Sequence, residues 1–118
     1  FRRVLFRSQA MEGMVRVGDY LFVHAGIRPG VPLEQQRGAD LRWIREPFIT
    51  SRDDLGCTVV YGHTIYDRPE LAASRIGIDT GAYDTGRLTA LGLEGTSRWL
   101  IETRVEDGTV IVSQRSIA

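Results

Sequence analysis

The sequence predicts a small α/β domain, mostly β with one or two helices, and three observations support this class. Short apolar runs are rich in β-branched residues, which is typical of strands. Glycine accounts for 13 of the 118 residues, above the usual share of about 7%, and indicates many tight turns. Only the stretch 33–49 is long enough, with apolar residues at helical spacing, to predict an extended helix. The length is that of one globular domain.

The first predicted element is a β-hairpin over residues 14–25, MVRVGDYLFVHA. Two apolar runs flank Gly18-Asp19, which is typical of a hairpin turn, and the second run predicts a strand buried on both faces. The next segment, 26–32, holds two prolines and two glycines and is expected to form a loop. A helix is expected over 33–49, ended or kinked by Pro47.

The rest of the chain predicts mainly strands. A β-branched run at 58–61 leads to His63, as the first buried strand leads to His24. The remaining expectations, in chain order, are one or two helical turns at 69–74, a strand at 75–79, a glycine-bounded turn at 81–86, and a meander of strands at 88–93, 98–105 and 109–114 with a hairpin turn at Asp107-Gly108.

Charge and composition exclude several classes of function. The chain carries 15 basic and 15 acidic residues, so no long-range field attracts nucleic acid or an anionic membrane, and neither is expected as a partner. All the basic residues are arginines, which excludes Schiff-base catalysis and the lysine of a Walker phosphate loop. The single cysteine and the lack of a long apolar stretch favour a cytoplasmic protein.

Residues 1–8 need a separate interpretation. They read FRRVLFRS, which matches the in-frame translation of a common sequencing-library adapter, so we expect an artefact foreign to the natural protein. The alternative is an arginine-rich amphipathic start, because Arg2, Arg3 and Arg7 come close to sharing one helical face. The natural chain is then expected to span 9–118, with its true beginning missing.

The two histidines are the main candidates for chemistry. His24 and His63 each follow a short apolar strand, and each has a glycine within two positions. Ligands and metals bind at strand ends in layered α/β folds, and neutral imidazole is the commonest metal ligand. A structural, hydrogen-bonded role for both is the alternative. Two imidazoles are too few to hold a metal ion by themselves, so other ligands must complete such a site.

Other residues carry less weight as functional candidates. Asp53 and Asp54 are expected in a solvated turn or helix cap. A thiol phosphatase loop starting at Cys57 would require arginine at position 63, so Cys57 is expected to be a small buried apolar side chain. Core or helix-to-sheet packing is expected for three aromatic side chains, Trp43, Phe48 and Trp99.

Four segments in series carry a family resemblance: FVHAG (22–26), LRWIREPF (41–48), VVYGHT (59–64) and IGIDTGAYDTGRLTAL (76–91). Together they resemble the C-terminal half of calcineurin-like metallophosphoesterases, most closely the bacterial serine/threonine protein phosphatase branch. The resemblance covers roughly 14–103. It implies a four-layer αββα sandwich, of which 9–118 would be the C-terminal part.

The resemblance also implies a reaction and roles for particular residues. Such enzymes hydrolyse phosphomonoesters with a hydroxide activated by two divalent ions; manganese is expected, with iron or zinc as alternatives. His24 and His63 would bind the second ion. Arg45 would be a catalytic, substrate-binding residue, because its planar fork suits two phosphoryl oxygens. Tyr83 would lie near the substrate, with packing beneath a turn as the alternative, and Asp79 would be structural or would orient a ligand.

Three motifs of the family's N-terminal half do not occur in this sequence: Gly-Asp-x-His-Gly, Gly-Asp-x-x-Asp-Arg-Gly and Gly-Asn-His-Glu. They supply the first-ion ligands and the bridging aspartate. This chain alone is therefore expected to be inactive, to need the missing N-terminal half of its domain as a partner, and to expose a sheet edge and apolar surface.

The expected substrate is a phosphorylated protein or a small phosphoester. Hydrolysis of symmetrical dinucleoside tetraphosphates is the enzymatic alternative, since it would use the same two ions. The alternative of another class is a non-catalytic β-rich binding module, in which both histidines are structural.

Overall fold

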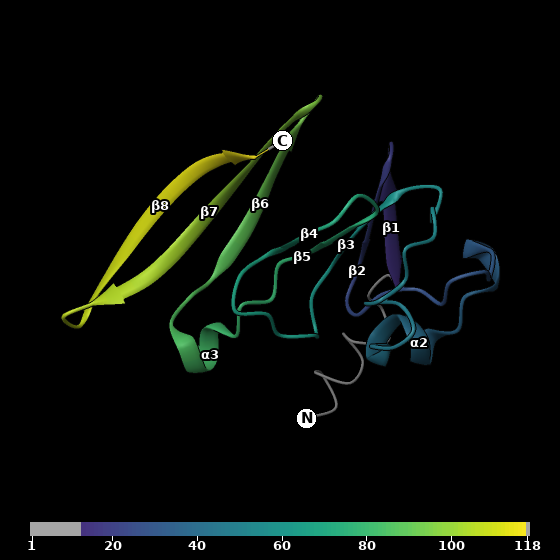
Figure 1. The fold of residues 1–118 in the computed structure, drawn as a ribbon, viewed down its shortest axis with the longest axis horizontal. Helices are drawn as coiled ribbons and strands as arrows, with labels where there is room; N and C mark the ends of the chain where they lie inside the picture. The colour runs from purple at the N-terminus through teal and green to yellow at the C-terminus, as the bar shows by residue number, and fades with distance from the viewer. Residues whose placement is uncertain (1–12, 118) are drawn as a thin grey trace, which may run out of the picture.

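The computed structural model describes residues 13–117, so residues 1–8 lie outside the described part. The described chain is a mixed α/β structure, mostly strands, with two short α-helices and two sheets (Figure 1). The elements are β1 (Met14–Val17), β2 (Tyr20–Val23), the 3-10 turn η1 (Leu33–Gln35), α2 (Gly38–Trp43), β3 (Thr58–Tyr61), β4 (Glu70–Leu71), β5 (Arg75–Gly77), α3 (Ala82–Thr85), β6 (Thr89–Glu94), β7 (Ser97–Glu106) and β8 (Thr109–Ile117).

The larger sheet has five strands in the order β1-β2-β3-β5-β4. The predicted hairpin is confirmed: β1 and β2 pair antiparallel, and Gly18 adopts the left-handed backbone of the turn. β2, β3 and β5 run parallel to one another. Burial of β2 is less complete than expected, because Leu21 is buried while Phe22 and Val23 are only half-buried. The parallel order brings the carboxyl ends of three strands to one edge.

The main hydrophobic core lies between this sheet and the segment that contains α2. The apolar face predicted for this segment is confirmed, since Leu41, Ile44 and Phe48 are all buried in one cluster with residues of β2 and β3, although only Leu41 lies within α2. The Phe48 ring meets the Tyr61 ring edge-on, with centroids 4.8 Å apart. This packing fixes the end of α2 against the strands that lead to the histidines.

The helix over 33–49 is much shorter than expected. Only 38–43 is α-helical, preceded by the short turn η1. The Gln36 side chain explains the break: its amide donates to the carbonyls of Arg28 and Val31, and its oxygen accepts from the Arg28 N–H, with the Gln36 backbone extended. Such side-chain-to-backbone bonds compete with helix formation. Downstream, Ile44 is also extended, ahead of Pro47.

The helical turns expected at 69–74 are absent, and the short strand β4 takes their place. Glu70 pairs with Gly77 and Leu71 with Ile76, and the Ala72 N–H donates to the Arg75 carbonyl to close the turn. The edge of β5 offers ladder hydrogen bonds instead, so the strand forms.

The second sheet is the predicted meander, in the order β6-β7-β8. The Asp107-Gly108 turn is confirmed, with both residues at positive φ. Where a turn was expected at 81–86, the structure has one helical turn, α3, between the left-handed residues Gly81 and Gly86. Arg98 of β7 links the two sheets by donating from Nε to the Tyr20 hydroxyl at 2.7 Å.

The two faces of the meander differ. Leu100 and Thr89 are buried on the face toward the five-stranded sheet. The register pairs Val105 with Val110 on the opposite face, where these two side chains and Val112 are exposed. This outer face is therefore an apolar surface. Among the described residues, no helix combines the length and apolar character that a membrane span requires.

Candidate functional site

The two histidines lie side by side because of the sheet topology. His24 directly follows β2, and His63 comes two residues after β3. Since β2 and β3 are parallel neighbours, both side chains leave the same edge of the sheet. The Gly62 N–H donates to the His24 carbonyl at 2.8 Å and continues the ladder up to the histidines.

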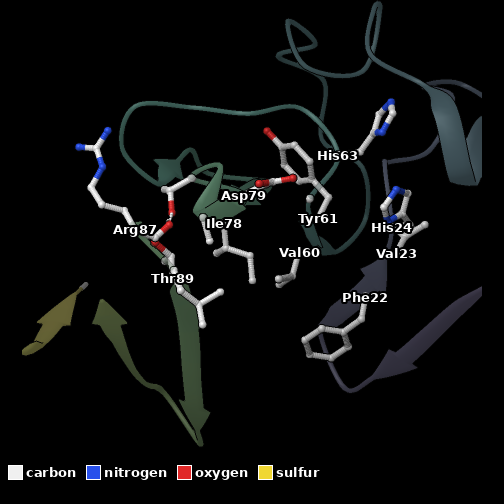
Figure 2. Close-up of a pocket in the computed structure, with 14 residues that line it drawn as sticks. Phe22, Val23, His24, Val60, Tyr61, His63, Ile78, Asp79, Arg87 and Thr89 are labelled. Carbon is white, nitrogen blue, oxygen red and sulfur yellow. Dashed lines mark hydrogen bonds between the residues drawn. The ribbon is translucent and has the colours of Figure 1, made fainter. Parts of the chain in front are cut away.

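The two imidazole rings have a separation suited to a shared ion. Their centroids are 5.3 Å apart and the ring planes are inclined by 52° (Figure 2). An ion about 2.0–2.1 Å from one nitrogen of each ring, at a tetrahedral angle, would place the centroids roughly 5 Å apart. The structure thus brings together the two residues that the sequence singled out.

His63 has two further features that are uncommon for a structural histidine. Its backbone φ is 67°, in the left-handed region, which non-glycine residues rarely adopt and which often marks functional sites. Its Nε2 atom is buried and has no hydrogen-bond partner among the described residues. Buried polar atoms are almost always paired, and among the described residues this atom and Oγ1 of the adjacent Thr64 lack a partner.

The surroundings of His63 favour its neutral form. Burial lowers the pKa of the imidazole, and the positive charge of Arg45 and the neighbouring His24 lower it further. A backbone hydrogen bond with Trp43 and the charge of Asp79 oppose the shift but do not cancel it. A metal-binding histidine must be neutral, so the lowered pKa keeps His63 in the form that binds an ion.

The end of α2 places Trp43 and Arg45 near His63. The Trp43 ring meets the His63 ring edge-on, with centroids 5.7 Å apart. Trp43 is 68% exposed, so the expected core packing of this residue is wrong, whereas Phe48 is buried as expected. Arg45 is exposed and lies close enough for its charge to act on His63. An exposed guanidinium is a group that binds anions, although Arg45 is not among the residues that line the cavity of His24 and His63.

Asp79 lies at the same edge of the sheet, because it comes two residues after β5, the third parallel strand. Its Oδ1 accepts from the Gly81 N–H at 3.0 Å, and its carbonyl accepts from the Tyr66 N–H. The contact with Gly81 is the structural role that the sequence suggested. The same carboxylate also acts on the pKa of His63.

A cavity of about 430 Å³ opens from this edge toward the meander (Figure 2). His24, His63 and Asp79 line one part of it, and Arg87 and Thr89 line another. Sequence reasoning missed the latter pair, since nothing in the local pattern around β6 indicated that the meander would face the histidines. Its apolar lining comes from Phe22, Val23, Val60, Ile78 and Leu88.

Tyr83 lies apart from the residues that line the cavity. It sits on α3 and is 89% exposed, which excludes packing beneath a turn. Its neighbour Ala82 lines the cavity, whereas Tyr83 does not. Its expected contact with substrate stays a prediction.

The remaining candidates behave as expected. The Asp54 Oδ1 accepts from the Gly56 N–H at 2.8 Å in a local turn, and both Asp53 and Asp54 are exposed. Cys57 is buried just before β3, and burial raises the pKa of its thiol. None of the three lines the cavity beside the histidines.

An ion pair joins the loop after His24 to α2. Arg28 donates from Nε and Nη2 to the two carboxylate oxygens of Asp40, both at 3.0 Å. This hydrogen bonding lowers the pKa of Asp40. The ion pair fixes the loop after His24 against α2, the helix that precedes Arg45.

Replacing Asp40 by asparagine should lower the melting temperature at neutral pH by a small amount, because the pair lies near the surface. A lowered carboxyl pKa contributes stability above the unfolded value of about 3.9, and this contribution disappears as the pH falls through the folded value. The difference between the native chain and the variant should therefore vanish in acid. A difference that grows below pH 4 would contradict this assignment.

Comparisons with known proteins identify no relative. A scan against protein-family models gave no match, and a search of curated proteins gave none either. Within residues 13–117, no group of three or more His, Cys, Asp or Glu side chains is arranged to hold a metal ion. Within this part of the chain, the candidate site therefore consists of the two imidazoles of His24 and His63, with Arg45 and the carboxylate of Asp79 nearby.

Proposed function

We propose that residues 9–118 form the C-terminal part of a calcineurin-like, two-metal phosphoesterase domain that acts on phosphoserine or phosphothreonine in proteins. The observation that carries this proposal is the pair of imidazoles at adjacent parallel strand ends, with ring centroids 5.3 Å apart, and with Nε2 of His63 buried and unpaired within residues 13–117. These features fit a divalent ion, which would supply the missing partner.

His24 and His63 would hold one ion, with manganese expected and iron or zinc as alternatives. When bound, such an ion polarises a phosphoryl oxygen and lowers the pKa of water. The chain's own residues prepare the site: the surroundings of His63 keep the imidazole neutral, and Arg45 presents an exposed guanidinium near it. A guanidinium binds two phosphoryl oxygens at once and opposes their negative charge.

Two donors do not complete a metal site. We propose that the other ligands, including the bridging carboxylate, come from an N-terminal half that carries the three motifs absent from this sequence. In the proposed four-layer sandwich, the two sheets would be the inner layers and α2 would belong to an outer layer. The exposed apolar face of the meander supports a partner of this size, because isolated domains rarely expose such patches.

The alternative of a binding module assigns both histidines a structural role. The unpaired Nε2 of His63 favours the enzyme instead, because a buried structural histidine normally has partners for its polar atoms. Dinucleoside tetraphosphate hydrolysis would use the same ions and the same histidines.

The purified 118-residue chain should show no manganese-dependent hydrolysis of p-nitrophenyl phosphate, because the motif that carries the bridging aspartate does not occur in its sequence. A protein in which this chain is joined to an N-terminal half that carries the three motifs, the joined two-half protein, should hydrolyse this substrate. Release of p-nitrophenol, followed by absorbance, measures both. Turnover by the isolated chain would show that a bridging aspartate is not needed. An inactive joined protein that binds metal would contradict the phosphoesterase assignment.

A further inference from the structure

A second cavity, of about 190 Å³, lies at the opposite edge of the five-stranded sheet. It is lined by residues 51–53 and by residues 72–75, which form the turn between β4 and β5. β5 begins at Arg75, whereas His63 follows the end of its parallel neighbour β3. The cavity is therefore separate from the imidazole pair.

Arg75, which lines this cavity, carries a buried charge that has no carboxylate partner in the described part of the chain. The residue is only 8% exposed, and its Nη1 donates a long hydrogen bond, 3.4 Å, to the Tyr61 hydroxyl. The guanidinium carbon lies 5.9 Å from the centre of the Phe48 ring. The ion pairs found among residues 13–117 do not include Arg75. Burying a charge is costly unless it is paired, and the Tyr61 hydroxyl and the Phe48 ring give Arg75 only neutral partners.

The other lining residues suit an oxyanion. Arg52 adds a second guanidinium, is exposed and forms no ion pair with the described residues. Ser51 and Ser74 add hydroxyl groups to the lining. Asp53 is the one acidic residue of the lining, so the lining residues carry two positive charges and one negative charge. Arginine forks and hydroxyl groups are the donors that tetrahedral oxyanions prefer.

We propose that this cavity binds a phosphate-like oxyanion, either as free phosphate or as the phosphoryl group of a larger ligand. Arg75 supplies the buried charge, and Arg52 closes over the anion from the surface. The site would be distinct from the phosphoryl position beside Arg45, because it lies at the other end of the parallel strands. It does not depend on the proposed phosphoesterase activity.

The test is a titration of the full 118-residue chain with inorganic phosphate at constant ionic strength, followed by the backbone amide resonances of residues 51–53 and 72–75. We expect saturable shifts in both segments. Arg52→Gln, an exposed substitution that should leave the fold intact, is expected to weaken binding roughly tenfold, as for loss of a charged hydrogen bond. Arg68→Gln, an exposed arginine outside the cavity, is the matched control.

Arg45→Gln separates the two anion positions and should leave these shifts unchanged. Retention of phosphate affinity in Arg52→Gln would overturn the proposal. So would an equal loss in Arg68→Gln, which would indicate attraction to net charge alone, or shifts confined to the surroundings of His24 and His63. A titration with phosphoserine then distinguishes free phosphate from a phosphorylated ligand, since the larger ligand should bind more tightly if it is the natural one.

Discussion

Replacing His63 by asparagine should abolish the phosphatase activity of the joined two-half protein and remove one of its two bound ions, while the fold is retained. His63 supplies one of two imidazoles to the proposed ion, and its Nε2 has no other partner among the described residues. Changes in residues that merely support a metal ligand already cost about 10- to 100-fold. Loss of the ligand itself should cost more than about 100-fold in activity.

Asparagine is the appropriate substitution because His63 has a left-handed backbone, with φ of 67°. Asparagine tolerates this region better than most residues, so a loss of metal cannot be attributed to backbone strain. Asp107→Asn is the matched control, since Asp107 is the other described non-glycine residue with positive φ and lies in the turn between β7 and β8. It should keep both ions and full activity. A His63→Asn protein that keeps both ions, measured by atomic absorption, would refute the assignment.

Replacing Gly26 by alanine should destabilise the chain by about 2–6 kcal/mol, because overpacking and an unfavourable backbone each cost roughly 1–3 kcal/mol. A Cβ at Gly26 would overlap the ring of Phe48, and this ring is fully buried. The φ of Gly26 is 151°, which side chains rarely adopt. Gly26 is two residues after His24, so the change should also disturb the metal-binding edge.

Gly30→Ala separates the two contributions in this experiment. Gly30 also has a positive φ, of 81°, but a Cβ there would meet no atom within 4 Å. The Gly30→Ala variant should therefore lose only the free energy that the unfavourable backbone conformation costs. Urea unfolding of the two variants measures the difference, and we expect Gly26→Ala to be the less stable by at least about 1 kcal/mol. Equal stabilities would show that Phe48 moves freely and does not fix the loop after His24.

Much of the fold could be predicted because local pattern and tertiary structure agree. The Gly18-Asp19 and Asp107-Gly108 turns, the strand at 58–61 and the meander all follow from turn chemistry and β-branched runs. The prediction of a helix over 33–49 was wrong, because the Gln36 side chain forms hydrogen bonds with the backbone of Arg28. The spacing of apolar residues gives no sign of these hydrogen bonds. The strand β4 could not be foreseen either, because its ladder partner β5 is supplied by the fold.

Part of the candidate site could be predicted from the sequence. Two histidines at the ends of apolar strands indicated a shared site, and the parallel pairing of β2 and β3 accounts for their contact. The left-handed backbone of His63 had no sequence signal, since histidine does not require it. Exposure of Trp43 depends on how α2 ends, and the presence of Arg87 in the cavity depends on a sheet that is remote in sequence.

The most direct test of the shared ion uses the fact that the chain has only two histidines. Zn²⁺ is titrated into the metal-free joined two-half protein, in which only residues 9–118 carry ¹⁵N-labelled imidazoles, and both rings are followed by NMR. One ion bound by both rings should shift their resonances together, with a single midpoint, and His63→Asn should remove the response of His24. Separate midpoints for the two rings, or a ring that does not respond, would contradict the account.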